Sequence, residues 1–202
     1  MAREALPWGP LNERTVHLCI EMQNVFAEDT LWRTPWMKRV LPHVTAIAGR
    51  HPERTIFTRF LPPAKPGDAP GTWRRYFERW EELTASRADP WLFELVEPLK
   101  GFVPPARVLD ERFYSPFHGT GLAQALRGQG CDAVVIAGAE TDMCVLAAVL
   151  DAVDLGLRVV LPLDALCSSS DEMHDALIAL YAGRFAQQVE TADTETILSC
   201  WS

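Results

Sequence analysis

Apolar segments alternate with segments of helical spacing along the chain, and this alternation is the strongest constraint on the fold. Strands are predicted for the runs rich in branched apolar residues, at 16–20, 54–60, 106–110, 132–138 and 157–165, with a further short strand at 187–191. Helices are predicted where apolar residues recur at helical spacing, at 36–49, 121–129, 142–155 and 171–182. Strands that alternate with helices form parallel sheets with both faces covered. The pattern predicts a doubly wound α/β fold, a three-layer α/β/α sandwich whose sheet is mainly parallel.

Length and composition indicate one globular domain over residues 1–202. The chain is 48% hydrophobic and 23% charged, as is usual for globular proteins. Its longest apolar runs are too short to span a bilayer, so no membrane partner is expected. The formal net charge of −8 opposes binding to nucleic acid. A small-molecule partner is therefore expected.

The N-terminus and the cysteines indicate a reducing compartment. The opening stretch "MAREALPWGPLNERTVHL" lacks the apolar core of a signal peptide, so a cytoplasmic location is expected. Five cysteines, at 19, 131, 144, 167 and 200, form no CxxC pair and have no zinc-site spacing, so they are expected to be reduced thiols. No GxxxxGK[ST] or GxGxxG motif follows any predicted strand, so nucleotide binding has no support.

The stretch "GAETDMCVLAAVL" (138–150) contains a candidate nucleophile. Thr141 is expected to cap a helix that begins near residue 142, and Gly156 suits its left-handed exit. Cys144 then lies in the first turn, where free backbone N–H groups favour a thiolate and can bind an oxyanion. The alternative is a small side chain that only packs in the core.

Two acidic residues directly follow other predicted strands. Glu21 follows the strand at 16–20, and Glu111 follows the strand at 106–110. Ligands of open α/β sheets bind outside the carboxyl ends of the strands, so both side chains are expected near Cys144. Glu21 is a candidate general base for the thiol. The alternative for Glu21 is a solvated or capping carboxylate.

A resemblance to a known family rests on the segments "CIEMQNVF" (19–26), "DERFYSPFHGTGLAQAL" (110–126) and "GAETDMCVLAAVLDAVDLGLRVVLPLDALCSSS" (138–170). They resemble the isochorismatase-like cysteine hydrolases, a family of amidases and related enzymes with a Rossmann-like fold. The resemblance implies that Cys144 is the nucleophile and that backbone N–H groups of Glu140 and Cys144 form an oxyanion hole. It also implies a cis peptide bond near Ala139–Glu140.

The function implied by this resemblance is hydrolysis of a small amide, ureido or carbamoyl compound, a non-peptide C–N bond, through a covalent thioester. No cofactor is implied. The Asp-x-His metal pattern of some members is replaced by "FTRFLPP" (57–63), so no metal is expected. Because family members commonly form dimers or tetramers, a homodimer or homotetramer is expected.

The chain departs from the family pattern at two catalytic positions. Glu21 stands where the family has aspartate, and Glu111 stands where it has lysine. A carboxylate near the thiol opposes thiolate formation, whereas an ammonium group favours it. Two rescues are open: Glu21 and Glu111 share one proton, or Arg112 or Arg59 supplies the missing positive charge. If neither operates, the protein is a silent or weakened family member that acts in ligand binding or oligomerisation.

Further residues are candidates for substrate binding. These candidates are Phe26, Arg59, Tyr114 and His118. Arg59 can instead form a structural ion pair, and Tyr114 and His118 can instead be packing or surface residues. The segment "TWRRYFERW" (72–80) predicts an aromatic helix that packs on the core, on another subunit or as a lid over a pocket. A third reading, glycoside hydrolysis by Glu21 and Glu111, has no other support in the chain.

Overall fold

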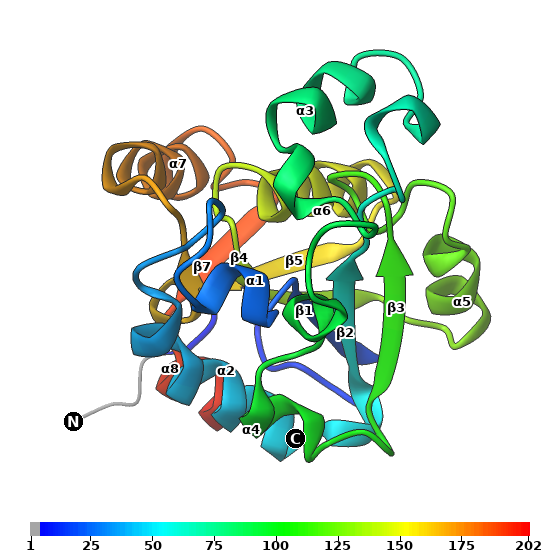
Figure 1. The fold of residues 1–202 in the computed structure, drawn as a ribbon. Coiled ribbons are helices and arrows are strands. Elements are labelled where there is room, and N and C mark those ends of the chain that lie inside the picture. The colour runs from blue at the N-terminus through cyan, green and yellow to red at the C-terminus, as the bar shows by residue number, and fades with distance from the viewer. Residues whose placement is uncertain (1–4) are drawn as a thin grey trace.

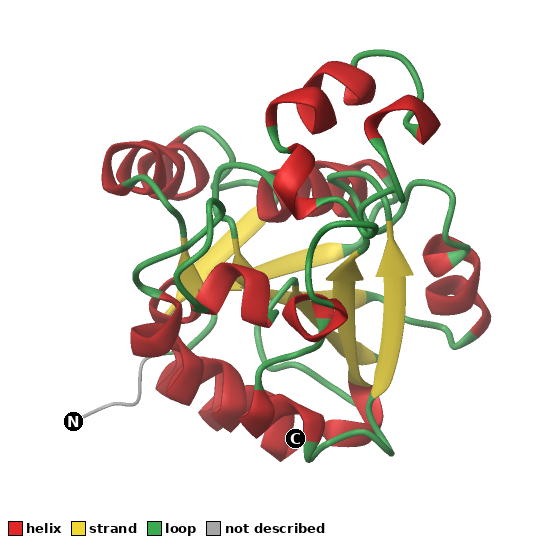
Figure 2. Ribbon diagram, viewed as in Figure 1, coloured by secondary structure: helices red, strands yellow, loops and turns green. Residues whose placement is uncertain are grey.

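The computed structural model describes residues 5–202, and a seven-stranded parallel sheet lies at its centre (Figures 1 and 2). The strands are β1 (Thr15–Ile20), β2 (Thr55–Phe60), β3 (Arg107–Glu111), β4 (Ala133–Ala139), β5 (Arg158–Pro162), β6 (Leu166–Cys167) and β7 (Val189–Ala192). Their order is β3-β2-β1-β4-β5-β7, and β6 pairs with the end of β4. The predicted parallel α/β sheet is confirmed.

Helices cover both faces of this sheet (Figure 1). They are α1 (Asn24–Ala27), α2 (Met37–Arg50), α3 (Trp73–Arg79), α4 (Glu97–Lys100), α5 (Leu122–Gly128), α6 (Cys144–Asp154), α7 (Asp171–Gly183) and α8 (Thr194–Cys200). One hydrophobic cluster joins α1, α2, α4 and α8 to the sheet, and a second joins α5, α6 and α7 to it. The three-layer sandwich follows from these two clusters.

Successive residues of the central strands supply the two clusters in turn. In β4, Val135 and Ala137 belong to the first cluster, whereas Val134 and Ile136 belong to the second. Because side chains of a strand alternate between its faces, a strand buried on both sides is apolar throughout. All seven residues of β4 are buried accordingly.

Strand β3 differs from this expectation, because Arg107, Val108 and Asp110 are exposed. It lies at the edge of the sheet and pairs only with β2. The predicted strand at 157–165 is also shorter than expected, since β5 ends at Pro162 and a 3-10 turn over Leu163–Ala165 precedes β6. Helix α8 was not predicted; the side chain of Asp193 caps its first turn by accepting the Thr196 N–H at 2.7 Å.

The order of the strands reverses between β1 and β4, which places a crevice at their carboxyl ends. Gly138 permits the close approach of these strands: its φ is +110°, and a Cβ there would lie 2.1 Å from the Ile20 carbonyl oxygen. Helix α3 stands beyond the ends of β2 and β3 (Figure 1). Among the helices of residues 5–202, none is long and apolar enough to cross a membrane.

Candidate active site

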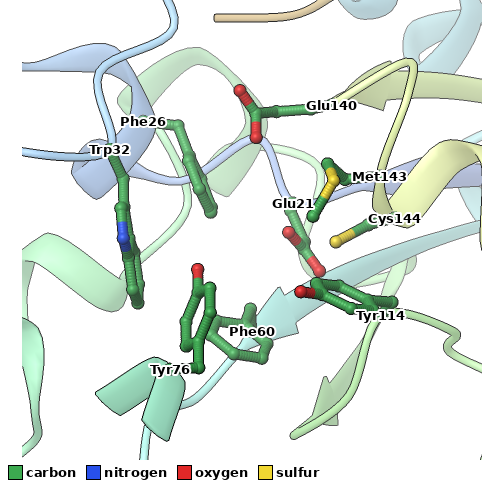
Figure 3. A pocket seen from close by; sticks show the side chains of 9 residues that line it. All are labelled: Glu21, Phe26, Trp32, Phe60, Tyr76, Tyr114, Glu140, Met143 and Cys144. Carbon is green, nitrogen blue, oxygen red and sulfur yellow. The ribbon is translucent and has the colours of Figure 1, made fainter. Parts of the chain in front are cut away.

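A cavity of about 30 Å³ opens at the carboxyl ends of β1 and β4 (Figure 3). It is lined by Glu21, Phe26, Trp32, Phe60, Tyr76, Tyr114, Glu140, Met143 and Cys144. Five residues proposed from the sequence therefore share one cavity: Cys144, Glu21, Glu140, Phe26 and Tyr114. This volume holds a compact group of a few atoms.

Cys144 is the first residue of α6, and its side chain is buried with 7% of the residue exposed. The expected cap by Thr141 is wrong, because the helix begins two residues later than predicted. The Thr141 hydroxyl instead donates to the Cys167 carbonyl oxygen at 3.1 Å and lies 2.8 Å from Nδ1 of His174. The predicted left-handed exit at Gly156 is confirmed by its φ of +79°.

The turn before Cys144 leaves one backbone N–H group without an acceptor among the residues that the structure describes. The Ala139–Glu140 peptide bond is cis, as the family resemblance implied. The N–H groups of Met143 and Val145 donate to the Glu140 carbonyl oxygen at 3.0 and 3.1 Å. Within residues 5–202 the N–H of Cys144 has no acceptor, so it is available to an oxyanion.

Glu21 lies immediately after β1 in a backbone conformation that few side chains adopt. Its φ is +48°, and its N–H donates to the Thr58 hydroxyl at 3.2 Å. Such a conformation persists only where neighbouring contacts hold it, and it is common at functional sites. The carboxyl group is buried and points toward the Cys144 sulfur across the cavity wall (Figure 3).

Glu111 lies at the end of β3, opposite Phe60 of β2, and is buried with 1% exposed. Within the described part of the chain, neither of its carboxyl oxygens has a hydrogen-bond partner. Burial raises the pKa of Glu111 to about 8, and the nearby Thr58 hydroxyl acts in the opposite direction. Glu111 is near enough to affect the titration of Glu21 and Cys144, yet it does not line the cavity.

Burial, with acidic neighbours adding to it, decides the protonation of the site. Burial raises the pKa of Glu21 well above its usual range, and the charge of Glu111 adds to this effect. Burial, Glu21 and Glu111 together raise the pKa of the Cys144 thiol well above its usual range. The lowering of the thiol pKa expected from the helix end is therefore corrected: desolvation and nearby carboxylates disfavour the thiolate.

Arg59, Arg112 and His118 lie outside the cavity. The Arg59 guanidinium donates to both carboxylate oxygens of Asp110, at 2.7 and 3.0 Å, and to Glu94 at 2.9 Å. Arg112 and His118 are exposed, and the His118 ring packs edge-on against Phe113. The prediction that Arg59 or Arg112 supplies the missing positive charge is therefore wrong, because neither side chain lies beside Cys144.

Four cavity residues were missed as site residues by the sequence analysis: Trp32, Phe60, Tyr76 and Met143. The aromatic spacing of segment 72–80 is the signal that could have identified Tyr76, which lies on α3 and lines the cavity, while the next residue, Phe77, is buried in the core. Nothing in the local sequence marked Trp32. Its ring reaches the cavity because it packs on Phe26, at 6.1 Å between centroids, and on Tyr76, at 5.8 Å.

The chemistry available in this cavity is that of a thiol and a carboxyl group that exchange one proton beside a free backbone N–H. Among residues 5–202, no three His, Cys, Asp or Glu side chains gather as metal ligands would. An electrophilic carbon placed against the Cys144 sulfur would have its oxygen near the N–H of Cys144.

The chain matches one protein family and is similar in sequence to two curated proteins. The chain matches the family described as "Isochorismatase domain" over residues 15–193. It is similar to maleamate amidohydrolase from Pseudomonas putida, at 30% identity over 52% of this chain and 48% of that protein. It is also similar to nicotinamidase 3 from Arabidopsis thaliana, at 29% identity over 48% of this chain and 50% of that protein. The chain thus spans about half the length of each of these relatives.

Solved structures share the fold over almost the whole chain. A cysteine hydrolase from Pseudomonas syringae pv. phaseolicola matches with a TM-score of 0.80 and 21% identity, over 98% of this chain and 97% of that one. N-carbamoylsarcosine amidase from Thermoplasma acidophilum matches with a TM-score of 0.72 and 18% identity, over 90% and 96%. At these identities the likeness concerns the fold.

Proposed function

Because this chain belongs to the isochorismatase domain family, we propose that it is a cysteine-dependent hydrolase of a small amide, ureido or carbamoyl compound. One observation carries the proposal: the Cys144 thiol, at the start of α6, and the buried Glu21 carboxyl line the same cavity, and the carboxyl is near enough to the thiol to affect its titration. Relatives named as amidases and amidohydrolases support the same reaction class.

The first half of the reaction is acylation of the enzyme. The Glu21 carboxylate takes the proton of the Cys144 thiol, and the sulfur forms a bond to the carbonyl carbon of the substrate. The carbonyl oxygen becomes an oxyanion that accepts a hydrogen bond from the N–H of Cys144. When the carbonyl re-forms, the C–N bond breaks, and the proton on Glu21 passes to the leaving nitrogen.

The second half returns the enzyme to its starting state. Water enters the space left by ammonia or the amine, and the Glu21 carboxylate takes one of its protons. The water oxygen bonds to the thioester carbon, the C–S bond breaks, and the sulfur regains a proton from Glu21. The product is a carboxylic or carbamic acid, and the enzyme is unchanged.

Glu111 permits this cycle in its neutral form. Glu21 and Glu111 are both buried, and burial raises the pKa of each, so the neutral forms dominate at neutral pH and the charge of Glu111 would further disfavour ionisation of Glu21. The reactive form is the one in which Glu21 has lost its proton and Glu111 keeps its own. In that form, Glu21 is free to act as the base. The sharing of one proton, proposed from the sequence, is the rescue that the placement of these residues supports.

A second candidate function is ligand binding by a catalytically silent protein. The observation in its favour is the raised pKa of the Cys144 thiol, since it has no positive side chain beside it to favour a thiolate. This candidate predicts binding in the cavity without turnover.

Ammonia release from a panel of small amides tests the two candidates. We expect Cys144→Ser to lose at least about 1,000-fold in rate, as substitutions of catalytic nucleophiles do. Cys131→Ser is the matched control, because Cys131 precedes β4 at the opposite end of that strand. Added hydroxylamine should intercept the thioester and yield a hydroxamate. Equal rates for Cys144→Ser and the parent protein would overturn the proposal.

A further inference from the structure

The walls of the cavity combine aromatic rings with carboxylates and contain no basic side chain. Five of its nine lining residues are aromatic, namely Phe26, Trp32, Phe60, Tyr76 and Tyr114. Two are acidic, Glu21 and Glu140, and none is Lys, Arg or His. Figure 3 shows Phe26 and Trp32 across the opening from the Cys144 sulfur, with the Glu140 carboxylate above the opening in that view. An anionic group would meet two carboxyls here without a positive partner.

The aromatic rings are fixed by contacts with one another. Trp32 stacks on Phe26 with an interplanar angle of 15°, and it packs against Phe60 and Tyr76 with 5.8 Å between centroids. Phe26, Trp32 and Phe60 are all buried. The faces of these rings carry negative partial charge, and cations are attracted to them within about 6 Å. In residues 5–202 the cation–π pairs involve Trp36 and Trp80, so these rings hold no cation of the chain itself.

Glu140 has no ion-pair partner within the described residues. Its Oε1 accepts hydrogen bonds from the Ser169 N–H at 2.9 Å and from the Thr34 hydroxyl at 3.5 Å. These bonds fix the side chain while Oε2 stays open to a ligand. A fixed carboxylate beside aromatic rings is the arrangement that recognises ammonium groups.

We propose that the substrate is a small amide that carries a positively charged amine, with the ammonium group among Phe26, Trp32 and Tyr76 and paired with Glu140. The amide carbonyl then reaches Cys144 on the other side of the opening. This inference rests on the proposed hydrolase function and names its substrate class. The small cavity restricts the charged group to a compact one, such as a primary ammonium.

A cationic substrate also compensates for the unusual charge of the site. The acids that line the cavity, Glu140 and Glu21 when it is ionised, have no basic side chain among the cavity residues. A bound ammonium group offsets their charge and favours the thiolate form of Cys144. The substrate thereby supplies the positive charge that the chain lacks at position 111.

Three amides of similar size test the proposal: 4-aminobutanamide, which is cationic; pentanamide, its neutral analogue; and succinamate, which is anionic. We expect kcat/KM for 4-aminobutanamide to exceed that for pentanamide by about 10-fold, the ratio that one counter-charge contact supports. Succinamate should be the poorest of the three. The ratio between the first two should fall to about 2 in Glu140→Gln and stay near 10 in Glu172→Gln, an exposed control.

Binding to Cys144→Ala, measured by calorimetry, separates this inference from the hydrolase proposal. Tighter binding of 4-aminobutanamide than of pentanamide to Cys144→Ala supports the cation site even if no amide is hydrolysed. In the double variant Cys144→Ala/Tyr76→Leu, the affinity for 4-aminobutanamide should be lower. Equal hydrolysis of the cationic and neutral amides, or a ratio unchanged by Glu140→Gln, would overturn the inference and leave the hydrolase proposal standing.

Discussion

The buried carboxyl of Glu111 makes a direct prediction about stability. Its ordinary pKa of 4.5 rises to about 8 in the folded protein because the group is removed from water. At about 1.36 kcal/mol for each pKa unit, this change corresponds to about 5 kcal/mol of folding free energy. The substitution Glu111→Gln keeps the shape of the side chain and removes its ionisation.

The sign follows from where each state releases the proton. Below pH 4.5 the carboxyl is protonated in both the folded and the unfolded chain. Between pH 4.5 and about 8 the unfolded chain has released the proton while the folded protein keeps it, so stability falls as pH rises, by up to about 1.4 kcal/mol per pH unit. Above that window the loss levels off. The variant lacks this contribution.

We therefore expect Glu111→Gln to gain stability relative to the parent protein as pH rises, by up to about 5 kcal/mol between pH 4.5 and 8. Urea unfolding followed by tryptophan fluorescence at several pH values measures the difference. Glu78→Gln, the same substitution at an exposed position, is the control and should follow the parent. A difference that changes by less than about 1 kcal/mol across this window would refute the argument from burial.

Three other substitutions test the site and its frame. Gly138→Ala should lower the free energy of unfolding by more than about 3 kcal/mol, because its Cβ would lie 2.1 Å from the Ile20 carbonyl oxygen. The control Gly128→Ala, which has open space around it, should be neutral or stabilising in the same urea assay. Glu111→Lys should raise the rate of iodoacetamide alkylation of Cys144 at pH 7 by about 10-fold or more, since an ammonium favours the thiolate, and a slower rate would contradict this. Arg59→Met should lower the free energy of unfolding by about 1 to 2 kcal/mol, because its ion pairs with Asp110 and Glu94 are lost, and should leave kcat/KM within about 3-fold of the parent value. A loss of hydrolysis without a loss of stability would instead indicate that Arg59 binds the substrate.

The sequence located the residues that follow the strands, because this depends on local pattern. The predicted strands ended just before Glu21 and Glu111, and the structure places Glu21 directly after β1 and Glu111 as the last residue of β3. In a parallel sheet the carboxyl ends of all strands lie at one edge. Cys144 could be placed at the start of α6 for the same reason. Such inferences need only the order of strands and helices along the chain.

The sequence did not reveal which side chains of these segments turn inward. Arg59 and Glu111 lie at the ends of neighbouring strands, yet Arg59 pairs with Asp110 and Glu94 whereas Glu111 is enclosed without a partner. The aromatic wall was equally hidden, since the Trp32 ring packs on Phe60 and Tyr76, which are distant in sequence, as well as on Phe26. Contacts between distant segments have no local pattern.

The sequence by itself determined the parallel α/β fold, the family and the position of the cysteine, because hydrophobic periodicity and motif spacing are properties of the chain. The tertiary structure decided the electrostatics: it buried two carboxyl groups beside Cys144, directed Arg59 away and closed an aromatic wall around the thiol. The physical reason is that the charge state of a buried group depends on how far it is from water and from other charges, and those distances exist only in the folded chain.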